Sequence, residues 1–193
     1  SHQGEHWITD VWKCTKTLSA DGRKIYDRED LLPADAPELD GLIDYVEGVL
    51  DALAITHGPA HTEVILTACG PRLLETGARL SGLANPPALQ AATGNDQVAL
   101  TCTSYLEPAR LASFPKRYRL QQHARGLNLI ARHSGVFAQL DVRKRLEALP
   151  SFYNARFRFT EGRPKTPTID LNSSPGAVFL VHPSADRIRQ DHE

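Results

Sequence analysis

The contrast between one long helical pattern and several short alternating segments most constrains the fold of this chain. Residues 37–54 carry an apolar stripe whose members recur at steps of three and four, and this spacing predicts an amphipathic helix. Elsewhere, short runs alternate apolar and polar residues between Gly and Pro, a pattern typical of strands. The mixture of the two patterns predicts an α+β protein.

The same patterns place the other elements along the chain. Strands are expected over 6–16, 23–26, 60–67, 71–76, 120–132, 135–140, 152–159 and 176–182. Helices are expected over 85–107 in two pieces that are interrupted near Gly94, over 141–149, and after Ser184. Pro108 and Pro115 mark the expected boundary between two parts, 1–107 and 108–193.

Composition excludes several classes of partner. The 193 residues include 22 Lys and Arg against 23 Asp and Glu, a net charge of −1, so no excess of positive charge favours nucleic acid or an anionic membrane. No apolar run approaches the roughly 20 residues of a spanning helix. The three cysteines have no metal-ligand spacing, which predicts reduced thiols and a cytoplasmic protein. We therefore expect no nucleic-acid partner and no membrane association.

The stretch from Gly58 to Gly82 brings two acidic residues together. If residues 68–70 form a three-residue hairpin loop, Thr67 lies opposite Pro71 and Glu63 lies opposite Glu75. Like charges that face each other across two strands destabilise a sheet. A bound cation, a shared proton or a basic neighbour must therefore offset the repulsion.

Three interpretations of this carboxylate pair stay open at this point. Mg²⁺ binds one or two carboxylates together with phosphate oxygens. Retaining glycosidases hold two carboxyl groups about 5–5.5 Å apart. In the third interpretation the register differs and one Glu faces water. Arg79 lies on the same alternating face, four residues after Glu75, and favours an anionic ligand beside a metal, although a salt bridge to either Glu would also explain it.

This stretch resembles the C-terminal half of the ATP-grasp domain of carboxylate–amine ligases, especially the amino-acid (dipeptide) ligase branch. In that family an acidic residue on one strand precedes, by about a dozen positions, a motif E-x-N-x-R or E-x-G-x-R followed by small residues. Here the motif reads Glu63, then Glu75-Thr76-Gly77-Ala78-Arg79, then Ser81-Gly82. The resemblance is specific over about residues 6–107 and weaker in the remainder, which looks like the small lobe that closes such ligases.

The resemblance implies roles for three residues. Glu63 and Glu75 would hold Mg²⁺, or Mn²⁺, against the phosphates of ATP, and Arg79 would stabilise the transferring phosphoryl group as a catalytic residue. Gly77 stands where many relatives have a further metal ligand, Asn, which leaves the number of ligands open. The implied fold is the C-terminal subdomain of an ATP-grasp domain, an antiparallel sheet with packed helices, followed by a small α/β lobe.

The implied function is an ATP- and Mg²⁺-dependent ligase. It would join a small-molecule carboxylate to an amine through an acyl-phosphate. A non-catalytic nucleotide- or metal-binding module is the alternative, and a two-carboxylate glycosidase is a distant third. The chain has no Met and no glycine-rich phosphate loop. We therefore expect it to begin inside the domain, to need an N-terminal half of the same protein as its partner, and to be inactive alone; a homodimer is also compatible with the sequence.

Overall fold

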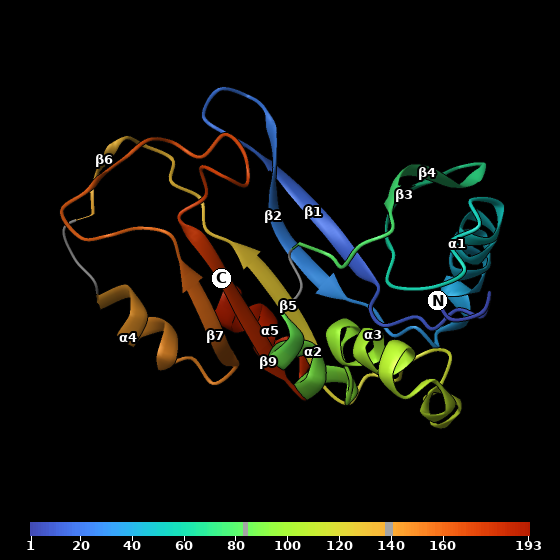
Figure 1. Ribbon diagram of the computed structural model, residues 1–193. Coiled ribbons are helices and arrows are strands. Elements are labelled where there is room, and N and C mark those ends of the chain that lie inside the picture. The colour runs from blue at the N-terminus through green and yellow to red at the C-terminus, as the bar shows by residue number, and fades with distance from the viewer. Residues whose placement is uncertain (83–84, 138–140) are drawn as a thin grey trace. The chain divides into compact units, whose positions relative to one another are not determined.

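The structure, a computed structural model, describes residues 1–82, 85–137 and 141–193 (Figure 1). Its helices and antiparallel sheets confirm the expected α+β class. The chain forms two compact units: unit 1 contains Ser1–Val11 and Pro33–Leu120, and unit 2 contains Trp12–Leu32 and Gln121–Glu193. The boundary expected between residues 107 and 108 would separate an ATP-grasp half from a closing lobe. Contacts inside this chain do not test that division, so it stays a prediction.

Unit 2 is built on a five-stranded antiparallel sheet in the order β1-β2-β5-β9-β7. Its strands are β1 (Trp12–Leu18), β2 (Lys24–Leu31), β5 (His123–Asn128), β7 (Phe152–Phe157) and β9 (Gly176–His182). The helices α4 (Asp141–Glu147) and α5 (Ala185–His192) and a short pair of strands, β6 (Gly135–Val136) and β8 (Pro164–Lys165), complete the unit.

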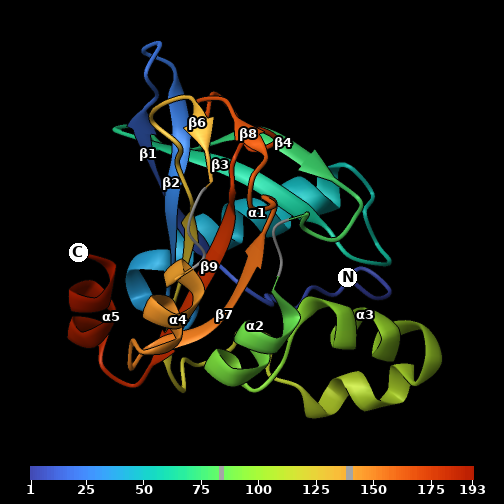
Figure 2. The same cartoon turned by 90° about the vertical axis from the view of Figure 1, so that its left-hand side faces the viewer.

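The core of unit 2 lies between the sheet and its helices. Val178 and Leu180 alternate along β9 and pack with Ile188 of α5, and all three are almost fully buried. Helix α5 contacts β9 and β5, while α4 contacts β7 (Figure 2). The expected strand 176–182 and the expected helix after Ser184 are both confirmed, and the Ser184 hydroxyl accepts a hydrogen bond from the backbone N–H of Arg187.

Unit 1 combines helices with one hairpin. Its elements are the 3₁₀ helix η1 (Pro37–Leu39), α1 (Asp40–Ala52), β3 (His61–Thr67), β4 (Gly70–Gly77), α2 (Pro86–Thr93), α3 (Gln97–Leu106) and a second 3₁₀ helix, η2 (Pro108–Ser113). Ile43 and Leu50 bury the apolar stripe of α1, as the spacing predicted. Gly94 adopts a left-handed conformation that ends α2, so the predicted interruption is confirmed.

Four predicted strands need correction, and one of them, 120–132, covers only His123–Asn128. Residues 6–11 of the predicted strand 6–16 belong to unit 1, where Ile8 makes only a single bridge to Arg117, and the strand itself begins at Trp12. The strand predicted over 23–26 extends to Leu31 in β2, because β2 pairs with β1 on one edge and with β5 on the other. The strand 135–140 covers Gly135–Val136, and residues 138–140 lie outside the described residues.

Candidate functional site

The hairpin of β3 and β4 carries the predicted carboxylates, and its loop differs from the expected one. Residues 68 and 69 form a two-residue loop, and Gly70 begins β4 with φ +92°, a conformation that favours glycine. Thr67 therefore lies opposite Gly70 and not opposite Pro71, so the predicted pairing is wrong beside the loop.

A β-bulge restores the predicted pairing farther along the hairpin. The register shifts between Glu63 and Val64, where β4 contains one extra residue, Leu74. Beyond this bulge Glu63 lies opposite Glu75, as expected from the sequence. Two displacements of one residue, one at the loop and one at the bulge, cancel and bring the two acidic residues face to face.

Each of the two carboxylates has a basic neighbour. The Nε2 atom of His61 lies 3.5 Å from Glu63 Oε1, and the Nη2 atom of Arg79 lies 3.5 Å from Glu75 Oε1. The contact of Arg79 is the salt bridge that the sequence left as an alternative. The side chains of Glu63 and Glu75 are 43% and 64% exposed, so water screens both pairs and each contributes less than about 1 kcal/mol.

Arg79 is held by the backbone that follows β4. Its N–H donates to the carbonyl of Gly77 at 2.8 Å, and its guanidinium donates to the carbonyl of Leu80 at 3.1 Å. The N–H of Ser81 donates to Oε1 of the buried Gln97 at 2.8 Å, which ties this segment to α3. Sequence reasoning missed Gln97, because a contact across 16 residues leaves no local pattern.

The donor set fits a hard divalent cation. Carboxylate oxygens are the ligands that Mg²⁺ prefers, and both carboxylates are open to solvent on one hairpin. Within residues 1–82, 85–137 and 141–193, no group of three or more His, Cys, Asp or Glu side chains could hold a metal ion. The hairpin therefore supplies two protein carboxylates, and a bound Mg²⁺ would complete its coordination with water or phosphate oxygens.

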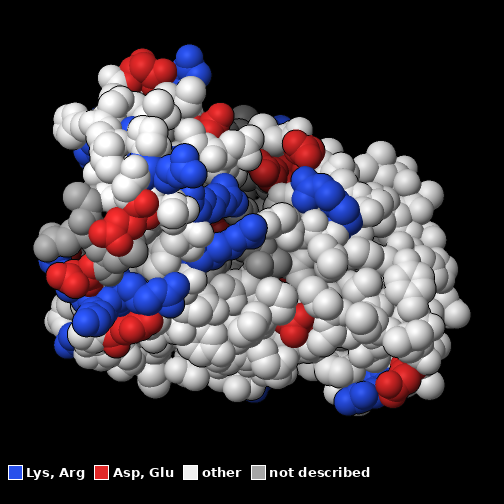
Figure 3. Space-filling view, turned by 60° about the vertical axis from the view of Figure 1, so that its left-hand side comes forward, with Lys and Arg blue, Asp and Glu red and all other residues white. Residues whose placement is uncertain are grey.

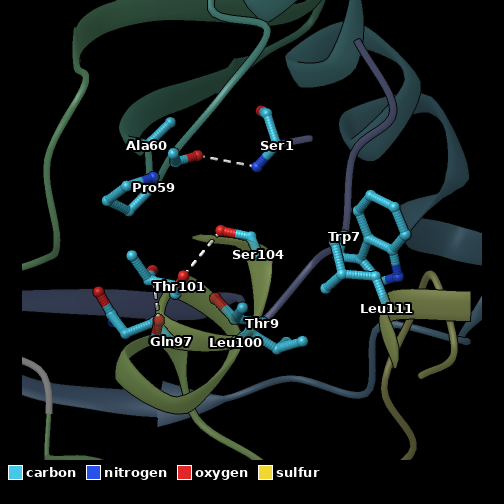
Figure 4. Close-up of a pocket in the computed structure, with 11 residues that line it drawn as sticks. Ser1, Trp7, Thr9, Pro59, Ala60, Gln97, Leu100, Thr101, Ser104 and Leu111 are labelled. Atoms are coloured by element: carbon cyan, nitrogen blue, oxygen red, sulfur yellow. Dashed lines mark hydrogen bonds between the residues drawn. The ribbon is translucent and has the colours of Figure 1, made fainter. Parts of the chain in front are cut away.

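A separate cavity in unit 1 does not include these carboxylates. The cavity has a volume of about 60 Å³, and α3 contributes Gln97, Leu100, Thr101 and Ser104 to its wall (Figure 4). Ser1, Trp7, Thr9, Gly58, Pro59, Ala60 and Leu111 line the rest of it. It is too small for a nucleotide, since sites for ligands of drug size span about 300–1,000 Å³.

Charged side chains of both signs lie close together on the surface. On part of the face that Figure 3 draws, Lys and Arg are interspersed with Asp and Glu. This mixture agrees with the net charge of −1. No helix in the described part of the chain combines the length and the apolar character that crossing a membrane requires.

Comparisons with known proteins found relatives of about twice this length. No family model matches the chain. Dapdiamide A synthase of Enterobacter agglomerans is 26% identical over 191 residues, which are 97% of this chain and 45% of that protein. An L-amino acid ligase from Bacillus licheniformis has a similar structure (TM-score 0.81, 20% identity), with 100% of this chain matching 49% of that one.

A phosphoribosylglycinamide synthetase from Anaerococcus prevotii also shares the fold, with a TM-score of 0.70 and 13% identity. The match covers 96% of this chain and 48% of that protein. The chain therefore spans about half the length of the proteins that it matches.

Proposed function

We propose that this chain is the C-terminal half of an ATP- and Mg²⁺-dependent carboxylate–amine ligase. The chain has the ATP-grasp fold and resembles ligases of that fold. The opposed pair of Glu63 and Glu75, with Arg79 beside it, is the observation that carries the proposal. The lengths of the relatives support the assignment of a half, because the chain spans 45% of one ligase and 49% of another.

The reaction would proceed in two displacements. A carboxylate oxygen of the first substrate bonds to the γ-phosphorus of ATP while the bond from that phosphorus to the leaving oxygen breaks, which releases ADP. The amine nitrogen of the second substrate then attacks the acyl carbon, loses a proton and displaces inorganic phosphate. The products are an amide, ADP and phosphate.

The residues of the hairpin have distinct roles in this proposal. Glu63 and Glu75 hold the metal ion, which when bound neutralises charge on the phosphate oxygens. Arg79 donates hydrogen bonds to the transferring phosphoryl group, because a guanidinium matches the geometry of phosphate and keeps its charge at every physiological pH. Phosphoryl transfer needs such positioning and charge neutralisation more than it needs a nucleophilic side chain.

Other parts of the prediction belong to the same proposal. The small-molecule carboxylate and amine, the N-terminal half as a partner and the closing lobe follow from the resemblance, and the cytoplasmic location follows from the three cysteines without metal-ligand spacing. A nucleotide- or metal-binding module without ligase activity is the second candidate.

Formation of ADP tests the proposed function. The complete protein is incubated with ATP, Mg²⁺ and a panel of carboxylates and amino acids, and ADP is measured by a coupled assay. Glu75→Gln keeps the size of the side chain but removes its charge, so we expect turnover to fall by about 100-fold or more.

Glu107→Gln is the matched control. Glu107 is equally exposed and forms a similar surface ion pair with Arg110, at 3.5 Å. We expect its turnover to stay within about twofold of the wild type, as for other surface changes. Equal rates for Glu75→Gln and the wild type would show that the site is wrongly assigned. Binding of ATP without ADP formation on any substrate pair would favour the non-catalytic module.

A further inference from the structure

Gly77 leaves space that the side chain of Arg79 occupies. A Cβ atom built on Gly77 would lie 3.4 Å from both Cγ and Nε of Arg79 and 3.9 Å from its Cδ. The arginine side chain therefore folds back along β4, over the position where a side chain at residue 77 would begin.

The folded-back side chain reaches the second carboxylate. Arg79 lies two residues beyond the end of β4, in a turn where its N–H donates to the carbonyl of Gly77, and its side chain passes over Gly77 on the way to Glu75. With glycine there, the Nη2 atom of Arg79 lies 3.5 Å from Glu75 Oε1. The ion pair of Arg79 and Glu75 thus uses the space that Gly77 leaves open.

We propose that Gly77 is a positioning residue, whose lack of a side chain lets Arg79 fold back and contact Glu75 directly. The proposal rests on the proposed function, because it assigns the partner of Arg79 at the same site. Before ligands bind, Arg79 compensates the charge of Glu75 opposite Glu63, and this contact keeps the guanidinium within 3.5 Å of a proposed metal-holding carboxylate.

Two substitutions separate the contact from the fold. Gly77→Ala adds a Cβ at ordinary van der Waals distance and brings no oxygen donor. Gly77→Asn adds an amide oxygen beside the carboxylates and fills the space that the arginine stem occupies. The backbone of Gly77 is outside the left-handed region, so Ala and Asn can both adopt its conformation.

Side-chain NMR of the ¹⁵N-labelled complete protein, without metal, tests the contact. The Nε–H signal of Arg79 is assigned by its loss in Arg79→Lys. We expect Glu75→Gln and Gly77→Asn to move this signal in the same direction, while Gly77→Ala leaves it within the line width. A signal that Gly77→Asn does not move would overturn the proposal, since the arginine would then not depend on the space at residue 77.

Titration with Mn²⁺, followed by electron paramagnetic resonance, tests whether the ion pair of Arg79 and Glu75 opposes metal binding. We expect Gly77→Asn to bind Mn²⁺ roughly tenfold more tightly than Gly77→Ala, because the amide oxygen adds a ligand and Arg79 no longer compensates Glu75. Equal affinities of the two variants would contradict the proposal.

A further variant separates this proposal from the proposed function. Unchanged Mn²⁺ affinity in a Glu63→Ala, Glu75→Ala double variant would overturn the metal site itself. The NMR result would still decide whether Gly77 positions Arg79 against Glu75, because that measurement involves no metal.

Discussion

Asp191 is a buried carboxylate that contacts Ser151 and Arg187 of unit 2. It accepts hydrogen bonds from the N–H of Ser151 at 2.9 Å and from its hydroxyl at 2.7 Å, and Arg187 lies 2.8 Å from its other oxygen. Only 2% of the Asp191 side chain is exposed. Burial opposes ionisation, but the hydrogen bonds from Ser151 and the charge of Arg187 outweigh it and lower the pKa of Asp191.

Removal of this carboxylate should destabilise the protein. We expect Asp191→Ala to lower the free energy of unfolding by about 3 kcal/mol, because it leaves the buried donors of Ser151 without an acceptor. The measurement is urea denaturation followed by circular dichroism. Asp186→Ala is the control, since Asp186 forms an exposed pair with Arg189 and should cost less than about 0.5 kcal/mol. Equal losses in the two variants would contradict this account.

The effect of Asp191 should also depend on pH. A carboxyl group whose pKa is lower in the folded state stabilises above its unfolded pKa, about 3.9 for Asp, and this contribution is lost as pH falls through the folded value. The difference in unfolding free energy between wild type and Asp191→Ala should therefore be constant above about pH 5 and shrink toward pH 2. A difference in unfolding free energy that grows as the pH falls would contradict a lowered pKa of Asp191.

For single residues, the sequence was sufficient to predict contacts between residues that are close together in the chain. Glu63 and Glu75 could be paired because a short loop joins their strands, and the cap at Ser184 precedes its helix directly. The bonds between Ser151 and Asp191 join residues 40 positions apart, and no pattern in either segment indicates the other.

A single glycine at the start of β9 allows this strand to pair closely with its neighbour. Gly176, its first residue, has φ +150°, and a Cβ there would lie 2.2 Å from the carbonyl oxygen of Arg156 on β7. The two backbones approach so closely that no side chain fits between them. Glycine at the start of this strand therefore allows β9 to pair with β7.

Substitution of this glycine should disturb the pairing of β9 with β7. We expect Gly176→Ala to lower the free energy of unfolding by about 3 kcal/mol or more, because β7 must move away. Gly48→Ala in α1 should act in the opposite sense and stabilise by up to about 1 kcal/mol, since Gly48 is an exposed helix residue with nothing within 4 Å of its Cβ. Thermal unfolding measures the stability of both variants. A Gly176→Ala variant as stable as the wild type would contradict the close approach of the two backbones.

At the scale of elements the predictions succeed where periodicity is undisturbed. The helix α1, the two pieces α2 and α3, and β9 have the expected type and nearly the expected bounds. The bulge at Leu74 was not predicted, although the adjacent residues Leu73 and Leu74 interrupt the alternation of apolar and polar residues there. The start of β1 was missed because residues 6–11, which also look like a strand, are held in unit 1.

The whole molecule depends on pairings between distant segments. The hairpin β1–β2 joins β5 about a hundred residues later in the chain, which makes both units discontinuous in sequence. Pro108 and Pro115 could not reveal this division, because proline marks local breaks and not distant partners. The predicted ATP-grasp fold is nevertheless confirmed by solved structures that match all or nearly all of the chain.

Transfer of oxygen tests the proposed carboxylate activation most directly. The complete protein is given ATP, Mg²⁺, an amine and a carboxylate labelled with ¹⁸O in both carboxyl oxygens, and the released phosphate is analysed by mass spectrometry. If an acyl-phosphate forms, each phosphate carries one ¹⁸O atom from the carboxylate, and Glu75→Gln suppresses its release. Phosphate without ¹⁸O during amide formation would contradict activation through an acyl-phosphate.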